Sequence, residues 1–216
     1  MGLLSRTHAA LYDRVTAAAE RRWLGEARRH LLSSLAGRVL EIGAGTGANF
    51  RYYPPHVQVT AIEPSPHFLR RARMKLGEAQ ATIELRQADA QALPFGDDAF
   101  DAAVATLVFC TIPDPLRALA EVRRVTLAGA PLLLIEHVRA RTAGRRLLQN
   151  VGNPCQKILA GGCHLNRDTE ATVRAAGFRV EEVEELAVEW GLMPSILVRA
   201  TNGKDGRAPA FQRPQR

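Results

Sequence analysis

One stretch of the chain constrains its fold more than any other, because apolar residues lead directly into three alternating glycines. The apolar part is Val39-Leu40-Glu41-Ile42, and the glycine part is Gly43-Ala44-Gly45-Thr46-Gly47. Glycine is needed where a backbone turns sharply with positive φ or approaches a ligand closely. The run predicts a buried strand, a tight turn, and a helix from Thr46 whose free N–H groups attract an anionic group. We expect a small cofactor on this turn.

A second apolar run, residues 57–62, ends at Glu63, some way after the glycines. In a doubly wound sheet, a carboxylate about 20 residues after the glycine turn accepts hydrogen bonds from ribose hydroxyls. The spacing Gly43-x-Gly45-x-x-Ala48 also satisfies the loose fingerprint of nicotinamide enzymes. These two features alone leave both cofactor classes open.

Strand-like and helix-like segments alternate along the rest of the chain. Strands are expected over 39–42, 57–62, 83–87, 102–107 and 132–136, and helices over 65–76, 115–125 and 171–177. Alternation of this kind predicts a parallel sheet with helices on both faces. Residues 8–35 have a helical pattern that ends at Gly37, which we interpret as one or two lid helices.

Length and composition limit the possible functions. A chain of 216 residues with 46% hydrophobic residues fits one domain with a full core. This length leaves no room for the separate substrate domain that most nicotinamide dehydrogenases have, and the sequence has no Tyr-x-x-x-Lys pair. Both observations count against the nicotinamide interpretation.

The charge distribution argues against a nucleic-acid substrate. The net charge is +7, but residues 39–201 contain equal numbers of acidic and basic residues, so the excess lies in the two ends. A nucleic-acid enzyme more often has a basic groove around its site, whereas basic ends suit weak attraction to anionic lipid. We therefore expect no nucleic-acid partner and at most peripheral membrane contact.

The cysteines and the apolar segments indicate a cytoplasmic protein. Cys110, Cys155 and Cys163 are too few and too irregularly spaced for a disulfide framework, and they match no zinc-binding pattern, so no metal is expected. The first residues lack the apolar core of a signal peptide, and the longest apolar stretch, 131–135, is too short to span a bilayer.

Several motifs together resemble a known family. They are Glu41-x-Gly43-x-Gly45-x-Gly47, Ala88-Asp89-Ala90-Gln91-Ala92-Leu93-Pro94-Phe95 and Ala99-Phe100-Asp101. The chain, from about residue 38 to about residue 182, resembles the class I S-adenosylmethionine (SAM)-dependent methyltransferases, specifically the type 11 branch. Three finer segments, 107–114, 135–139 and 162–167, are similar to the methyltransferase-like thiol S-methyltransferases of animals and their bacterial relatives.

The resemblance implies the fold class and the domain boundaries. The expected fold is α/β, a Rossmann-like seven-stranded mostly parallel sheet with helices on both faces and a C-terminal antiparallel hairpin made of 178–188 and 195–200. Residues 1–37 would form N-terminal lid helices and 38–201 the methyltransferase domain. The tail 202–216, rich in Gly, Pro and Arg, is expected to be disordered.

The resemblance also implies which residues bind SAM. Glu41 would meet the amino-acid end, Glu63 the ribose, and Asp89 with the Ala90 amide the adenine, while Thr106 and Leu107 would line the sulfonium. The full expected set is Glu41, Gly43, Ala44, Gly45, Gly47, Glu63, Pro64, Asp89, Ala90, Thr106 and Leu107.

Three residues are candidate catalytic helpers, namely Asp114, His137 and His164. His137 follows the fifth strand at its carboxyl end, and histidine is the side chain best suited to remove a proton at neutral pH. A hydrogen-bonded structural histidine is an equally good interpretation. Residues 139–151 are basic and then amphipathic, which predicts either a solvated helix or a cap that steers anionic or amphiphilic acceptors.

The expected function is methyl transfer from SAM to a small, lipophilic acceptor, with a thiol as first choice, in a monomer or homodimer. A quinone C-methyltransferase or a phospholipid N-methyltransferase is the alternative, because these relatives share the cofactor motifs. A SAM-binding protein without catalysis is the third possibility. An amino-methylating nucleic-acid enzyme is disfavoured, since the Asn/Asp-Pro-Pro-Tyr/Phe motif is missing.

Overall fold

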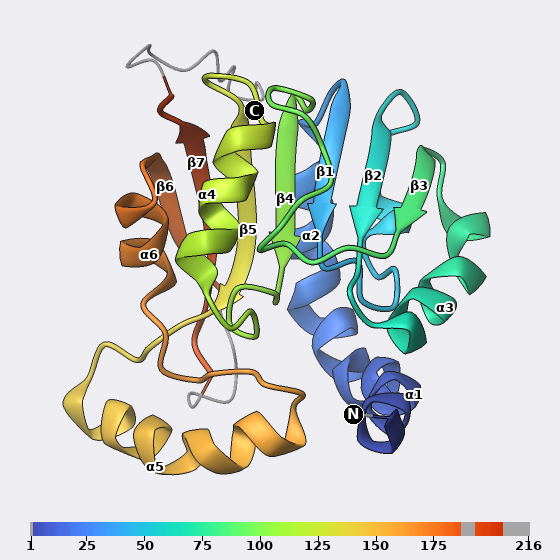
Figure 1. The fold of residues 1–216 in the computed structure, drawn as a ribbon. Helices are drawn as coiled ribbons and strands as arrows, with labels where there is room; N and C mark the ends of the chain where they lie inside the picture. The colour runs from blue at the N-terminus through green and yellow to red at the C-terminus, as the bar shows by residue number, and fades with distance from the viewer. Residues whose placement is uncertain (1, 187–192, 205–216) are drawn as a thin grey trace.

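A computed structural model describes residues 2–186 and 193–204, in which seven strands form one sheet in the order β3-β2-β1-β4-β5-β7-β6 (Figure 1). The strands are β1 Arg38–Ile42, β2 Gln58–Ile62, β3 Thr82–Arg86, β4 Ala102–Thr106, β5 Pro131–His137, β6 Phe178–Leu186 and β7 Ser195–Asn202. Strands β1 to β5 pair in parallel, and β7 pairs antiparallel with both β5 and β6. The predicted fold class is confirmed.

Helices cover the two faces of this sheet. The α-helices are α1 Gly2–Ala19, α2 Gly25–Leu32, α3 Pro66–Met74, α4 Pro115–Val125, α5 Ala143–Leu159 and α6 Thr169–Ala175. Short turns of other helix types are η1 Glu20–Leu24, η2 Phe50–Tyr52 and η3 Leu76–Glu78. Residues of α4 and α6 pack in one apolar cluster, and residues of α2 and α3 pack in another on the opposite face.

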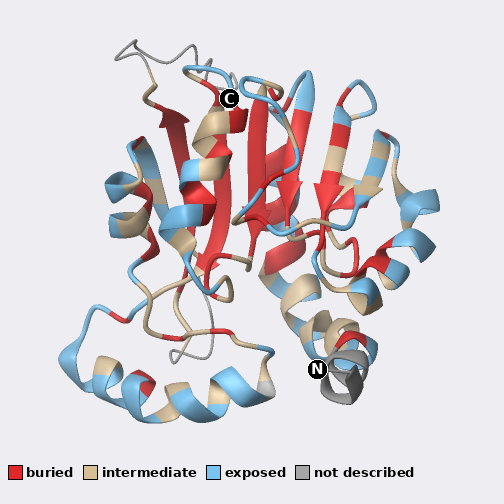
Figure 2. Ribbon diagram, in the orientation of Figure 1, coloured by how far each residue is buried: buried red, intermediate tan, exposed pale blue. Residues whose placement is uncertain are grey.

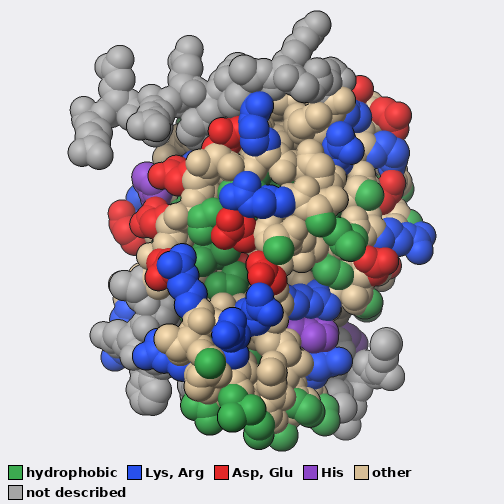
Figure 3. Space-filling view, turned by 90° about the vertical axis from the view of Figure 1, so that its left-hand side faces the viewer, with side chains coloured by type: hydrophobic (Ala, Val, Ile, Leu, Met, Phe, Trp, Pro, Cys, Tyr) green, Lys and Arg blue, Asp and Glu red, His purple; other side chains and the backbone are tan. Residues whose placement is uncertain are grey.

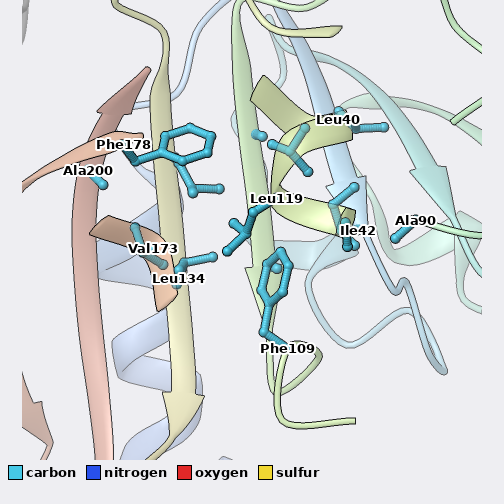
Figure 4. Close-up of a cluster of buried hydrophobic side chains, with 14 of the residues drawn as sticks. Leu40, Ile42, Ala90, Phe109, Leu119, Leu134, Val173, Phe178 and Ala200 are labelled. Atoms are coloured by element: carbon cyan, nitrogen blue, oxygen red, sulfur yellow. The ribbon is translucent and has the colours of Figure 1, made fainter. Parts of the chain in front are cut away.

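The central strands are buried because both of their faces are covered (Figure 2). Every residue of β4 is buried, and small alanines there let helices approach from both sides. In one cluster, Leu40 and Ile42 of β1 meet Leu119 of α4, and Val173 of α6 meets Phe178 (Figure 4). These two layers fix the positions of the strand ends.

The carboxyl ends of the parallel strands share one edge of the sheet, and α1 and α5 both lie beyond that edge (Figure 1). In an open α/β sheet this edge is where ligands bind. Among the described residues, no helix combines the length and apolar character that a bilayer crossing requires.

The helix expected from Thr46 is wrong. Residues after the glycines form turns and the short 3₁₀ helix η2 instead. Gly47 has φ +81, which breaks helical geometry. The side chains of Asn49 and Phe50 are both drawn into the interior, and Pro54 follows the extended Tyr53. Tertiary contacts therefore override the expected helix start.

The N-terminal segment forms one bent helix, because α1 runs through the π-helical turn η1 into α2. Helix α2 packs inside the domain, whereas α1 reaches toward α3.

Strand β7 continues to Asn202, the first residue of the tail expected to be disordered, and residues 205–216 lie outside the described residues. Residues 187–188, at the end of the predicted strand 178–188, also lie outside the described residues.

Candidate cofactor and active site

The glycine turn after β1 leaves open space at one of its three glycines. The φ angles are +67 at Gly43, +56 at Gly45 and +81 at Gly47. A Cβ at Gly43 would lie 2.6 Å from Val108, and one at Gly47 would lie 2.7 Å from Phe50. At Gly45 the nearest atom would be a backbone oxygen at 3.9 Å. Two glycines therefore pack against protein, and the third faces space that a ligand can fill.

Glu63, at the end of β2, supports this turn directly. Its Oε2 accepts a hydrogen bond from the Gly45 amide at 3.0 Å, and Oε1 accepts one from the Ser65 amide at 2.9 Å. Burial raises the pKa of Glu63, and the two amide hydrogen bonds oppose that rise. Each carboxylate oxygen has further lone pairs, so the side chain can also accept hydrogen bonds from ligand hydroxyls.

The loops after β2 and β3 meet beside Glu63. The Gln87 side chain donates a hydrogen bond to the Pro64 carbonyl at 3.1 Å. Asp89 is exposed, and its Oδ1 accepts from the Gln91 amide at 2.9 Å, while Ala90 is buried. The structure thus brings the residues expected around ribose and adenine to the same edge of the sheet.

A buried polar network lies beneath the glycine turn. Asn49 donates to Glu41 Oε1 at 2.8 Å, and Arg28 donates to Asn49 Oδ1 at 2.5 Å and to Thr106 Oγ1 at 2.6 Å. All four side chains are buried. Burial raises the pKa of Glu41 to about 7, and the Asn49 hydrogen bond and the Arg28 charge oppose this. The network joins α2, β1 and β4 at the position expected for the methionine part of the cofactor.

Arg28 and Asn49 were not predicted as site residues. Arg28 lies within the apolar stripe of Leu24, Ala27 and Leu31 on the predicted lid helix. A single arginine inside such a stripe must find buried partners, because an unpaired buried charge is costly. The arginine that interrupts this apolar stripe was therefore the sequence signal that could have identified Arg28 as a site residue. No sequence signal pointed to Asn49, since a helix was expected over that segment.

Leu107, directly after β4, has φ +61. This conformation is uncommon for a residue with a Cβ, and such outliers cluster at functional sites. The Leu107 amide donates to the Ile135 carbonyl at 2.7 Å, which ties the ends of β4 and β5 together.

Glu136 of β5 organises the loop that follows β4. Its Oε1 accepts from the Val108 and Phe109 amides at 2.8 and 2.7 Å, and its Oε2 accepts from the Cys110 amide at 3.2 Å. The side chain is fully buried, and burial raises its pKa to about 7 against the effect of these amides. One carboxylate thus fixes three consecutive backbone groups.

We expect Glu136→Gln to lower the free energy of unfolding by about 1–3 kcal/mol, because a carboxamide NH₂ would face a backbone N–H. The folded pKa lies above the unfolded value, so the contribution of the carboxyl group is full at low pH and is lost as the pH rises through about 7. Urea unfolding should therefore show that the free energy of unfolding of Glu136→Gln falls further below that of the wild type at pH 5 than at pH 8. Glu184 is exposed, so Glu184→Gln is the control. If both variants lost the same free energy of unfolding, the role of Glu136 in holding the loop after β4 would be contradicted.

The candidate catalytic residues occupy different environments. Asp114 is exposed and caps α4, where its Oδ1 accepts from the Arg117 amide at 3.0 Å. His164 contacts Cys110 twice, through its amide at 2.8 Å and its Nδ1 at 3.1 Å from the same carbonyl oxygen. His137 Nδ1 lies 3.9 Å from Cys163 Sγ. The two histidines therefore meet around the cysteines.

The surroundings of Cys163 favour its thiolate. Hydrogen bonding from Cys110 lowers the pKa of Cys163 against the effect of burial, and the hydrogen bond and charge of His137 act in the same direction. Both thiols are buried. Sequence spacing could not reveal the cluster of Cys110, His137 and Cys163, because its three members come from separate segments of the chain.

Polar contacts hold helix α1 next to the glycine turn. Asp13 accepts a hydrogen bond from Thr46 Oγ1 at 2.5 Å and forms a 2.9 Å ion pair with Lys75 of the segment after α3. Tyr12 packs edge-to-face on Phe68, with ring centroids 5.7 Å apart. Burial raises the pKa of Tyr12 to about 12, and Arg28, Cys110 and Cys163 all influence it. Tyr12 thus links α1 to α3 through Phe68.

These observations fit the cofactor that the motifs imply. The open space at Gly45 accommodates a ligand chain, and Glu63 beside it offers acceptors for a diol. The buried network holds Thr106 at the end of β4. Gly43, Ala44, Gly45, Gly47 and Pro64 line the turn and strand edge between them.

Comparisons with known proteins agree with this geometry. Residues 40–134 match the methyltransferase domain family. The thiol S-methyltransferase TMT1B of Rattus norvegicus is 35% identical over 160 residues, which are 70% of this chain and 62% of that protein. A phosphatidylethanolamine N-methyltransferase of Cereibacter sphaeroides is 39% identical over 108 residues, 49% of this chain and 53% of that protein.

A quinone methyltransferase and a solved structure are similar to this chain as well. A demethylmenaquinone methyltransferase of Deinococcus radiodurans is 32% identical over 120 residues, 54% of this chain and 50% of that protein. In all three relatives the chain covers less than two thirds of the relative's length. The solved N-methyltransferase NodS of Bradyrhizobium japonicum superposes with a TM-score of 0.63 at 20% identity, covering 88% of this chain and 98% of NodS, which shows a shared fold.

The sheet order, the glycine turn with its acidic strand ends and the matching domain family all lead to one assignment. The chain belongs to the class I SAM-dependent methyltransferases.

Proposed function

We propose that this protein transfers a methyl group from SAM to the sulfur of a small, lipophilic thiol. The observation that carries the proposal is the position of the His137 imidazole, which ends β5 at the carboxyl edge of the sheet and lies 3.9 Å from the Cys163 thiol. An acceptor thiol that reaches this edge of the sheet meets the same imidazole. The likeness to thiol S-methyltransferases supports the same acceptor class.

The chain's own residues would bind and align the cofactor. Glu63 accepts the ribose hydroxyls, Asp89 and the Ala90 amide meet the adenine, and the open side of Gly45 admits the amino-acid chain. Glu41 acts through the buried network, and Thr106 and Leu107 line the reacting end. When bound, SAM supplies a methyl group on a positively charged sulfonium.

The acceptor must lose its proton before it reacts. A free thiol has a pKa of about 8.5, so at neutral pH it needs a base or a nearby positive charge. Of the three candidate helpers, His137 is placed best for this, since Asp114 caps a helix and His164 contacts a backbone carbonyl. The new S–C bond then forms as the sulfonium–methyl bond breaks, and the products are a thioether and S-adenosylhomocysteine. Alignment and water exclusion account for the rest of the catalysis.

Methyl-labelled SAM and a panel of small and lipophilic thiols test this function. We expect an S-methyl product by mass spectrometry with the wild-type protein and its loss in Glu63→Ala. SAM binding without any thiol product would contradict the thiol assignment. Quinone and detergent-solubilised phospholipid acceptors run in parallel would then identify the alternative, which the menaquinone and phosphatidylethanolamine relatives support. Binding with no transfer to any acceptor would favour a non-catalytic role.

We expect His137→Asn to lower the rate at pH 7 by about 10- to 100-fold with SAM affinity unchanged, because proton removal is impaired. At pH 9 the acceptor ionises by itself, so the defect should shrink. The exposed His30 gives a control, His30→Asn, which should keep the wild-type pH profile. A defect of constant size from pH 7 to pH 9 would mean that His137 has only a structural role.

We propose a cytoplasmic location, because the three cysteines are free and reduced thiols persist in a reducing compartment.

A further inference from the structure

Three metal-ligating side chains meet at the carboxyl edge of the sheet. Cys110 lies in the loop after β4, His137 ends β5, and Cys163 follows α5. One ligand atom from each lies within 4.8 Å of the other two, and the Cys163 Sγ to His137 Nδ1 distance is 3.9 Å. The remaining cysteine, Cys155, is exposed on α5 outside the cluster.

The backbone around the cluster is held from several sides. The Glu136 carboxylate accepts from the Cys110 amide, and the Cys110 carbonyl accepts from the His164 amide. Arg167 donates to the Phe109 carbonyl and, at 2.6 Å, to the Ile112 carbonyl. These contacts fix the backbone that carries Cys110, so its thiol is held in place beside the other two side chains.

We propose that Cys110, His137 and Cys163 bind a thiophilic divalent cation such as Zn²⁺. Tetrahedral zinc has bonds of about 2.3 Å to sulfur and about 2.0 Å to nitrogen, which places ligand atoms about 3.5–3.8 Å apart. The cluster reaches this spacing with shifts of under about 1 Å. Binding releases the thiol protons, as metal binding to cysteine requires.

Three protein ligands leave one coordination position open, as in catalytic zinc sites. If the proposed function holds, this position is where the acceptor thiol would bind, and the metal would then stabilise its thiolate in place of a free His137 imidazole. Metal binding itself does not rest on the proposed function, and it is measured below without SAM or acceptor.

Cobalt titration of the reduced, metal-free full-length protein tests the site. We expect one equivalent of Co²⁺ to bind, with thiolate-to-cobalt charge-transfer absorption and the visible bands of tetrahedral cobalt. Cys110→Ser, Cys163→Ser and His137→Asn should each weaken binding at least about 10-fold. The matched control Cys155→Ser should bind as the wild type does.

Circular dichroism and melting curves establish that each variant is folded, and Cys163→Ala replaces Cys163→Ser if the latter is not. Failure of the reduced wild-type protein to bind cobalt would overturn the proposal, even if thiol methylation is observed. Equal binding by Cys163→Ser, or loss of binding in Cys155→Ser, would overturn it as well. The proposal also fails if the protein is isolated with Cys110 and Cys163 as a disulfide and binds no metal after reduction.

A second feature is independent of this cluster. Helix α5 exposes several of its apolar side chains, while Gln149 and Asn153 hydrogen-bond to the protein. The exposed fractions are 64% for Leu147, 71% for Val151 and 76% for Ile158, with Leu148 also exposed. Buried Gln149 bonds the Val138 carbonyl and the Ala140 amide. In the space-filling view, hydrophobic side chains gather along the lower edge, over α5 (Figure 3).

Asn153 of α5 has its partner within the protein too, whereas the exposed apolar side chains are not covered by any described residue. Asn153 Oδ1 accepts from the Leu165 amide at 2.9 Å. Arg145, Arg146 and Lys157 on the same helix form no ion pair with any described acidic residue. A concave surface beside the helix is lined by Arg139, Ala143, Arg146, Leu147, Asn150 and Asn166.

We infer that α5 lies in the surface of an anionic lipid bilayer. An exposed apolar face next to unpaired basic side chains is the pattern of interfacial helices, and the positive charges favour anionic headgroups. The hollow beside the helix offers guanidinium groups to a headgroup phosphate.

Sedimentation with phosphatidylcholine vesicles, with and without phosphatidylglycerol, tests this inference. We expect binding to the anionic vesicles and at least about a 10-fold loss in Leu147→Gln/Val151→Gln, because two exposed apolar side chains that would enter the bilayer are removed. The control Met74→Gln changes a side chain on α3 that is 80% exposed and should bind as the wild type does. No binding to anionic vesicles, equal binding by the double variant, or a stable dimer that the double variant disrupts would each overturn it.

Discussion

Replacement of Glu63 by alanine is expected to weaken SAM binding at least about 100-fold, because two charge-assisted hydrogen bonds to the ribose are lost. The same change removes the acceptor of the Gly45 and Ser65 amides, so the turn loses its support as well. Isothermal titration calorimetry measures the affinity, and a melting curve establishes that the variant is folded.

Glu63→Gln separates the two contributions, because it keeps one acceptor oxygen while the charge is removed. We expect an intermediate loss of about 10-fold in SAM affinity. The exposed carboxylate of Glu184 gives the control Glu184→Ala, which should bind SAM normally. Wild-type affinity in Glu63→Ala would show that the carboxylate serves the turn alone and that the ribose lies elsewhere.

Alanine at Gly45 and at Gly47 is expected to separate binding from stability. Gly45→Ala should cost only about 1–2 kcal/mol of unfolding free energy for its positive φ, yet reduce SAM affinity at least about 100-fold by filling the ligand space. Gly47→Ala should cost about 3 kcal/mol or more, because its Cβ would collide with Phe50 and lie 3.3 Å from Ala72. Urea unfolding and calorimetry on the same samples measure both quantities.

Gly129→Ala is the matched control for backbone strain. Gly129 has φ +75, and a Cβ there would have no atom within 4 Å. This variant should lose about 1–2 kcal/mol of stability and keep full SAM affinity. Normal SAM affinity in Gly45→Ala would contradict the placement of the cofactor at this turn.

Periodicity and turn residues were sufficient to predict the five parallel strands, and the family resemblance added the C-terminal hairpin. Helix α4 has the predicted bounds, since Asp114 and Pro115 mark its start in the sequence itself. The strands lie within one or two residues of the predicted ranges wherever the structure describes both ends. Their apolar runs are local features, so no tertiary information was needed.

The parts that failed depend on contacts between distant segments. The helix after Thr46 is lost because Asn49 turns inward to Glu41 and Arg28, and nothing within that segment encodes these partners. The grouping of Cys110, His137 and Cys163 likewise arises only when β4, β5 and the loop after α5 are brought together. Sequence spacing supports the cofactor residues better, because each of them lies near the carboxyl end of a single strand or in the segment that follows it.

The place of β7 in the sheet bears on when the sheet is completed during synthesis of the chain. Strand β7 ends at Asn202 of 216 residues, yet it lies between β5 and β6. Until it emerges from the ribosome, β5 has an unpaired edge that can associate with other chains. Since β5 carries Glu136 and His137, the surroundings of these two side chains are completed only when β7 has paired with β5.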